Sequence, residues 1–285
     1  MKEHRTTVLK IEPKKTGASA SWAIETDKLT KRYGTITAVD EVNLFVPVGK
    51  IFGLLGPNGA GKTTMIKMLT TLLNPTSGSA KVAGFDVKSA SSSVRKSIGY
   101  VPQMLSADGG LTGYENLKLS ARLYGMKRQY IKDRILEALD FMNLTDSKDR
   151  LVKTYSGGMI RRLELAQAML HRPKILFLDE PTIGLDPVAR RVVWSRLLAL
   201  KKEFGMTVLI TTHDMEEADT LCDELAIMHR GKIAAVGTPA RLKAAVKKGA
   251  NMHDVFVHFS GGADIEEGGN YRDIRSTRRT ARRLG

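Results

Sequence analysis

The sequence lacks the features that mark secreted, disulfide-bonded or membrane-spanning chains. Its 285 residues include a single cysteine, Cys222, so neither an intrachain disulfide nor a thiolate metal cluster can form. Cys222 stands in an apolar stretch, and we predict that it is a buried packing residue. No apolar run approaches the roughly 18 residues that a membrane-spanning helix needs. The first residues, MKEHRTTVLKIEPKK, contain no apolar stretch like that of a secretory signal. We therefore expect a protein that stays in the cytoplasm.

Basic residues are concentrated at the two ends of the chain. Of a net charge of +15, residues 1–20 contribute a balance of +3 and residues 271–285 a balance of +5. We predict a basic N-terminal extension over residues 1–21, and a Gly-rich linker with a basic tail over residues 261–285. The arginines of the tail could face solvent or contact anionic lipid, and binding to nucleic acid is the least favoured of the three alternatives.

Short apolar runs alternate with helical periodicity over most of the chain, which is typical of an α/β domain. The predicted strands cover residues 23–26, 41–46, 51–55, 98–101, 175–178, 208–211, 224–229 and 232–236. Those at 51–55, 175–178 and 208–211 are almost wholly apolar, so we place them at the centre of a sheet that helices cover.

Helical signals replace strand signals between residues 103 and 173. Thr112 and Glu115 have the spacing of a capping box ahead of an apolar-periodic run. A second helix is predicted around residues 131–142, and a third over residues 157–171, before Pro173. This stretch predicts a helical subdomain inserted into the α/β domain.

A phosphate-binding loop is predicted at residues 56–63, GPNGAGKT, directly after an apolar strand and before a helix-compatible run. Glycines let backbone amides turn toward phosphate oxygens, and the helix N-terminus adds its positive end. Lys62 would reach the terminal phosphates, and Thr63 would place its hydroxyl on Mg²⁺. The alternative, an ordinary Gly-rich turn, does not account for the strand in front. The predicted nucleotide contacts are Gly56, Pro57, Asn58, Gly59, Ala60, Gly61, Lys62, Thr63 and Thr64.

Two acids end the apolar segment KILFLDE, where α/β sheets bind ligands. Asp179 is the expected magnesium partner. Glu180 is the expected general base, because that role needs a carboxylate beside the γ-phosphate and off the metal. The alternative is that both acids only end the strand and cap the next helix.

Further motifs resemble, in their order along the chain, those of the ATP-binding subunits of ABC transporters. The resemblance covers about residues 22–260 and implies a role for each matching residue. Tyr33 would stack on adenine, Gln103 would contact Mg²⁺ and the attacking water, and His213 would sense the γ-phosphate. The sequence YSGGM at 155–159 looks like the signature loop, with Ser156, Gly157 and Gly158 contacting ATP. Asp186, in GLDP, matches the loop that joins two protomers and is counted among the ATP-binding residues.

The form YSGGM departs from the commoner LSGGQ and is similar to that of daunorubicin-resistance-type drug and polysaccharide exporters. The resemblance implies a phosphate-loop ATPase core of the ABC type, with an antiparallel β part and the helical insert over about residues 103–173. It also implies ATP and Mg²⁺ as cofactors, a homodimer that sandwiches two nucleotides, and a separate transmembrane permease docked near residues 104–124. The protein would then work on the cytoplasmic face of the membrane. A soluble regulatory or nucleic-acid-associated ATPase is the alternative, and YSGGM argues against a nucleotide kinase.

Overall fold

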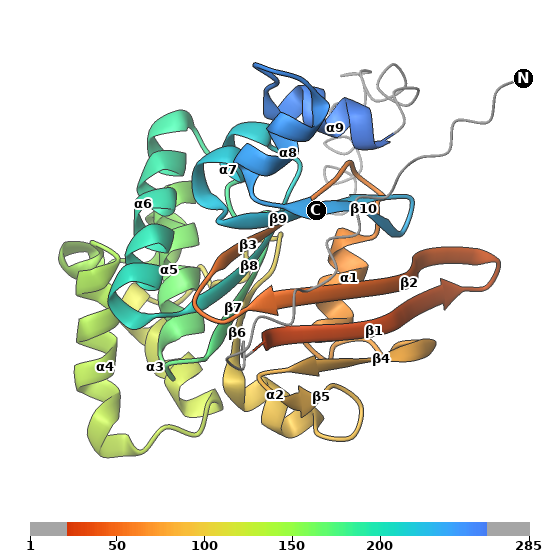
Figure 1. Cartoon of the computed structure of the whole chain (residues 1–285). Helices are drawn as coiled ribbons and strands as arrows, with labels where there is room; N and C mark the ends of the chain where they lie inside the picture. Colours follow the sequence, from red (N-terminus) through yellow and green to blue (C-terminus); the bar gives the residue numbers. More distant parts are fainter. Residues whose placement is uncertain (1–21, 261–285) are drawn as a thin grey trace, which may run out of the picture.

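Two β-sheets form the centre of the computed structural model, which describes residues 22–260 (Figure 1). The basic extension and tail predicted at residues 1–21 and 261–285 lie outside the described residues, and so does the lipid contact considered for the tail. Within residues 22–260, no helix has the length and apolar character that crossing a bilayer requires.

The larger sheet has six strands in the order β10-β9-β3-β8-β7-β6. Its bounds are β3 (Ile51–Leu55), β6 (Ile98–Val101), β7 (Ile175–Asp179), β8 (Thr207–Thr212), β9 (Glu224–His229) and β10 (Lys232–Gly237). All neighbouring pairs are parallel except β9 and β10. Every residue of β3, β7 and β8 is buried, which confirms that the three most apolar runs form the centre of this sheet.

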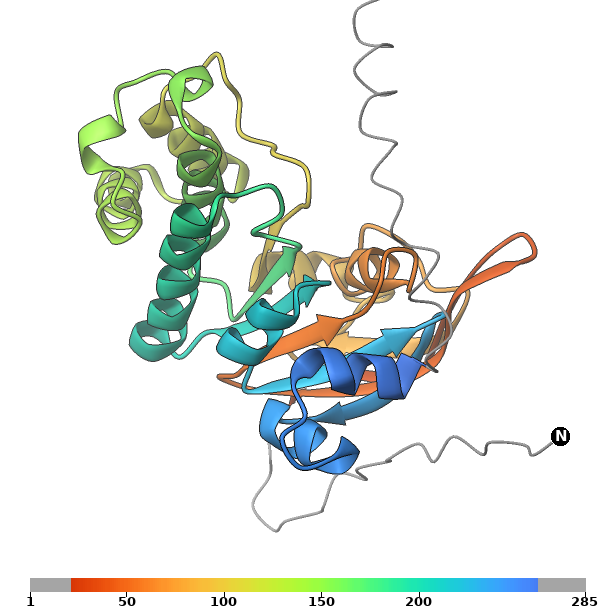
Figure 2. The same cartoon turned by 90° about the horizontal axis from the view of Figure 1, so that it is seen from above.

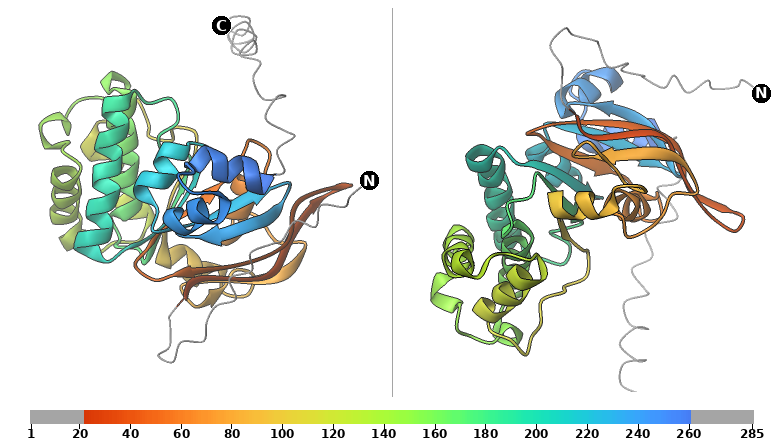
Figure 3. Two further views of the ribbon diagram at one scale, coloured as in Figure 1. Left: turned by 45° about the horizontal axis from the view of Figure 1, so that its top comes forward. Right: turned by 90° about the horizontal axis from the view of Figure 1, so that it is seen from below.

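The smaller sheet is antiparallel, with the order β2-β1-β4-β5. The strands predicted at 23–26 and 41–46 are only parts of a long hairpin formed by β1 (Trp22–Tyr33) and β2 (Ile36–Pro47), which projects past the larger sheet (Figure 3). The sequence analysis missed β4 (Ser77–Val82) and β5 (Phe85–Asp86). The segment SGSAKV has little apolar character, and its extended form depends on pairing with β1.

Helices cover the larger sheet on both faces, as its apolar strands require. Helix α1 (Lys62–Leu69) buries Met65, Ile66 and Leu69 in a core shared by the two sheets. The opposite face of the larger sheet packs against a second core, to which α5 (Gly157–Met169), α6 (Pro187–Phe204) and α7 (Met215–Leu221) contribute. Cys222 is buried beside this core, as predicted, and burial raises the pKa of its thiol. Three further helices outside the stretch between β6 and β7 are α2 (Ser91–Ser97), α8 (Pro239–Val246) and α9 (Met252–Ser260).

The chain between β6 and β7 forms a helical lobe beside the two sheets (Figure 2). It contains α3 (Gly113–Leu123), α4 (Arg128–Phe141) and α5 (Gly157–Met169), with 3₁₀ turns at Thr145–Ser147 and Val152–Thr154. The capping box is confirmed: Thr112 Oγ1 accepts from Glu115 N at 3.1 Å, and Thr112 N donates to Glu115 Oε2 at 2.9 Å. Helix α5 ends at Met169, two residues earlier than predicted.

Candidate nucleotide site

The glycine-rich loop at residues 56–61 joins β3 to α1 and turns tightly over the end of the sheet. Gly61 has a φ of +105°, and a Cβ there would collide with the backbone carbonyl of Ala38 on β2. A cavity of about 340 Å³ lies over the loop. Its lining consists of Ala38, Asn58, Gly59, Ala60, Gly61, Lys62, Thr63, Thr64, Gln103 and Glu180.

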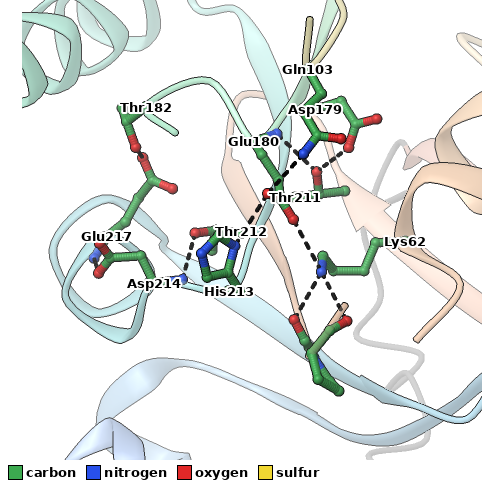
Figure 4. Close-up of polar contacts among 12 residues, drawn as sticks. Lys62, Gln103, Asp179, Glu180, Thr182, Thr211, Thr212, His213, Asp214 and Glu217 are labelled. Atoms are coloured by element: carbon green, nitrogen blue, oxygen red, sulfur yellow. Dashed lines mark hydrogen bonds and ion pairs between the residues drawn. The ribbon is translucent and has the colours of Figure 1, made fainter. Parts of the chain in front are cut away.

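Lys62 is buried, and its ammonium group points back across the loop (Figure 4). Its Nζ donates to the carbonyl oxygens of Gly56 at 2.8 Å and Pro57 at 3.1 Å, and it lies 3.3 Å from Glu180 Oε1. A phosphate group can compete for this ammonium only by replacing one of these three acceptors.

Asp179 lies at the end of β7, buried to 1% exposure, and faces the start of α1. Its Oδ1 accepts from Thr63 Oγ1 at 3.2 Å and from Thr211 Oγ1 at 2.6 Å. Sequence reasoning missed Thr211, although it ends the predicted strand 208–211 that neighbours β7. Two oxygen-donor side chains, Thr63 and Asp179, are thus held together at the phosphate loop.

Glu180 projects between the loop and the neighbouring strand ends. Its φ of +49° lies in the left-handed region, which residues with a side chain adopt uncommonly. The backbone N–H of Glu180 donates to both the carbonyl and the hydroxyl oxygen of Thr211, each at 3.1 Å, which stabilises this conformation. The carboxylate is therefore held at a fixed position beside Lys62.

Gln103 and His213 approach the second carboxylate oxygen of Glu180 (Figure 4). Gln103 Nε2 donates to Oε2 at 3.4 Å, and His213 Nδ1 lies 3.2 Å from the same oxygen. The hydrogen bond from His213, together with the charge of Lys62, lowers the pKa of Glu180. The same hydrogen bond raises the pKa of His213. Glu180 is consequently ionised at neutral pH.

Ser156, Gly157, Gly158 and Asp186 form a second group, away from the lining of the phosphate-loop cavity. Ser156 caps α5 by accepting from Met159 N at 3.3 Å, and Asp186 caps α6 by accepting from the backbone N–H groups of residues 188 and 189 at 3.0 Å. A Cβ at Gly158 would lie 2.7 Å from the Cβ of Ala189, so the two helix starts pack closely. The exposed starts of α5 and α6 therefore form one surface.

Tyr33 lies at the end of β1 with 47% of its surface exposed. It pairs across the hairpin with Ile36, two residues before Ala38 of the cavity lining. Lys31 Nζ lies 5.3 Å from the centre of the Tyr33 ring. The ring is accessible from solvent, as stacking on a base would require, and this role stays a prediction.

Glu217 is a buried carboxyl that sequence reasoning missed. It accepts from Thr182 Oγ1 at 2.7 Å and from Trp194 Nε1 at 2.9 Å, and burial raises its pKa. A second link between the same segments joins Arg190 to Asp214 at 2.5 Å. These contacts tie the segment after Glu180 to the helix after His213. No local pattern distinguishes Glu217 from its exposed neighbour Glu216.

A glycine-rich loop between a parallel strand and a helix, with a buried lysine and two strand-end acids, defines a phosphate-loop nucleotide-binding ATPase domain. The antiparallel sheet and helical lobe define its type more narrowly. A family model described as "ABC transporter" matches residues 39–183. The chain belongs to the ABC transporter family and is one of its ATP-binding ATPase subunits.

Comparisons with individual proteins agree with this family assignment. The chain is 47% identical over 236 residues to the daunorubicin/doxorubicin resistance ATP-binding protein DrrA of Streptomyces peucetius, covering 83% of this chain and 71% of that protein. It is 41% identical to the Nod factor export ATP-binding protein I of Paraburkholderia xenovorans, covering 82% and 76%. Its structure resembles cbiO1 of Clostridium perfringens, part of the ABC transporter complex cbiONQ, with a TM-score of 0.72, 27% identity and coverage of 78% and 91%.

Proposed function

We propose that this chain drives export by binding and hydrolysing ATP at the phosphate loop, with Glu180 as the general base. The contact between Lys62 and Glu180 supports the proposal most directly, because an ionised carboxylate lies beside the ammonium group that would bind the terminal phosphates. Glu180 would take a proton from the attacking water, and Gln103 would orient that water. His213, 3.2 Å from Glu180, would hold the γ-phosphate.

Thr63, Asp179 and Gln103 fit a magnesium ion by the chemistry of their donors. All three offer oxygen atoms, which this cation prefers, and Thr63 and Asp179 already lie within hydrogen-bond distance of each other. A small number of protein ligands is enough for Mg²⁺ in a nucleotide site, because water and phosphate oxygens usually occupy most of its coordination positions. The ion would neutralise charge on the phosphates, and the side chains would orient it.

A dimer would complete the site. Ser156, Gly157 and Asp186 are exposed on one surface, whereas the lining of the phosphate-loop cavity contains none of them. The exposed N-terminus of α5 attracts an anion. We therefore propose that this surface binds the γ-phosphate of ATP held by a second copy, so that two chains enclose two nucleotides and separate after hydrolysis.

The proposed partner is a transmembrane permease, to which this chain would bind on the cytoplasmic side of the membrane. Exposed apolar residues lie in and before α3, within residues 104–124, where the permease is predicted to dock: Met104 is 82% exposed and Leu123 79%. Export as the direction is supported by the Nod factor export relative. A soluble regulatory or nucleic-acid-associated role remains the second candidate from the sequence, and none of the contacts described above favours it.

Light scattering of the Glu180→Gln protein tests the dimer. With Mg-ATP the mass should double, and with ADP it should return to that of a monomer. Adding Ser156→Arg should abolish dimerisation, because the large arginine side chain would block the surface at the start of α5. Ser195→Arg is the matched control, since Ser195 is exposed in the middle of α6. A monomer that binds ATP without dimerising would contradict the proposed sandwich.

A further inference from the structure

Helix α5 contains a buried pair of opposite charges that the proposed chemistry does not use. Arg161 and Glu164 stand three residues apart on the helix, and their side chains are only 1% and 2% exposed. Arg161 Nη1 lies 2.9 Å from Glu164 Oε2. The helix that carries them begins at the exposed glycines beside Ser156.

Both charged side chains also hold the backbone that follows β6. Arg161 donates through Nη1 to the carbonyl of Pro102 at 2.8 Å and through Nη2 to the carbonyl of Gln103 at 2.9 Å. Glu164 Oε1 accepts from the backbone N–H of Ser106 and from its hydroxyl, the latter at 3.1 Å. The pair therefore fixes both ends of the segment from Pro102 to Ser106.

The two residues between the fixed ends are exposed and apolar. Met104 is 82% exposed and Leu105 50% exposed. Gln103, on the same segment, lines the phosphate-loop cavity and donates to Glu180. An apolar contact surface and a site residue are thus neighbours on one short segment whose backbone is held by α5.

A purely stabilising role does not account for this arrangement. A buried ion pair gives little net stability, because desolvation of the two charges offsets their attraction. The other hydrogen bonds of both side chains are made with the loop, whereas Arg161 Nε is buried without a hydrogen-bond partner among the described residues. What the pair achieves is a fixed geometry between the loop and the helix.

We propose that Arg161 and Glu164 are positioning residues that make Gln103, the Met104–Leu105 tip and the start of α5 move as one unit. This inference rests on the proposed function. A partner that displaces the Met104–Leu105 tip would displace both halves of the nucleotide site, because the pair links the tip to Gln103 and to α5. Gln103 would shift at its own chain's phosphate loop, and Ser156 would shift at the loop of the second copy.

The test removes the polar contacts while keeping the volume. Arg161→Met/Glu164→Met replaces both charges by long apolar side chains, an exchange that buried ion pairs often tolerate without loss of stability. Arg134→Met/Glu137→Met is the matched control, because this pair has the same spacing on α4 and is partly exposed. Each protein is measured by amide hydrogen exchange over residues 100–110, by ATP binding and by ATP hydrolysis.

In the Arg161/Glu164 variant we expect amide exchange over residues 103–106 to accelerate about tenfold, since the Ser106 amide loses its acceptor. Hydrolysis should fall about tenfold or more through misplacement of Gln103, with ATP affinity within about twofold. The control should change neither. If the double variant does not fold, Arg161→Lys is read in the same way, because lysine keeps the charge beside Glu164 but lacks the fork that reaches two carbonyls.

Unchanged exchange in a folded variant overturns the proposal, whatever happens to hydrolysis. Faster exchange with unchanged hydrolysis also overturns it, since the pair would then hold the loop without affecting ATP hydrolysis. Failure of the proposed function would give a different result from failure of this inference. The unaltered protein would then hydrolyse no ATP, while the exchange measurement would still show whether Arg161 and Glu164 hold residues 102–106.

Discussion

Replacing Glu180 by glutamine tests the centre of the site, because it keeps the shape of the side chain and removes its charge. The carboxylate is buried, ionised and held by Lys62 at 3.3 Å and His213 at 3.2 Å. A general base contributes about 10²- to 10⁴-fold to a rate, equivalent to about 2.7 to 5.5 kcal/mol of the barrier. We expect Mg-ATP hydrolysis at saturation to fall by a factor in that range.

ATP binding should respond in the opposite direction. In the free protein, Glu180 competes with phosphate for the Lys62 ammonium. A hydrogen bond to a charged group contributes about 1.5 to 3 kcal/mol, and the amide of glutamine retains part of it. We therefore expect the affinity for ATP to increase about tenfold, which corresponds to about 1.4 kcal/mol.

The assay pairs phosphate release at saturating Mg-ATP with calorimetric binding of ATP. Glu216→Gln is the matched control, since Glu216 is exposed on the first turn of α7 and should leave both quantities unchanged. Hydrolysis within about fivefold of the unaltered protein is too small a loss for a general base and would refute the role of Glu180. Weaker ATP binding would refute the competition for Lys62.

Three further predictions concern neighbouring contacts. Glu217→Gln should leave the stability equal to that of the unaltered protein below the ordinary carboxyl pKa. Above that pH the variant should become more stable than the unaltered protein, because burial raises the pKa of Glu217 and its ionisation in the folded state is costly. A difference in melting temperature between the two proteins that is the same at every pH would contradict this. Gly61→Ala should abolish ATP binding, since its Cβ collides with Ala38 at a positive φ, and near-normal affinity would show that the loop adapts. Glu180→Gln should lower the pKa of His213 in an NMR titration; the stability from this pair is present below the ordinary imidazole pKa and is lost as pH rises through the raised one, so an unchanged pKa would argue against the contact.

Local chemistry determined much of the fold and of the site. The apolar runs of β3, β7 and β8 predict central strands because only a sheet covered on both faces buries every side chain. The glycine, lysine and threonine spacing of residues 56–63 indicates a phosphate loop because the chemistry of phosphate binding lies within eight consecutive residues. The resemblance to ABC transporter subunits then predicted roles for residues that are far apart in the sequence, such as Tyr33 and His213, and these roles stay predictions.

Only the tertiary structure decided which distant groups meet. Thr211 reaches Asp179 because β7 and β8 are neighbours in the sheet, and Arg161 reaches the backbone of Gln103 because α5 packs beside the end of β6. The strand Ser77–Val82 is extended because β1 pairs with it, although its own residues favour no such form. Side-chain patterns record local propensity and burial, whereas contacts between segments depend on strand order and helix packing, which no single segment contains.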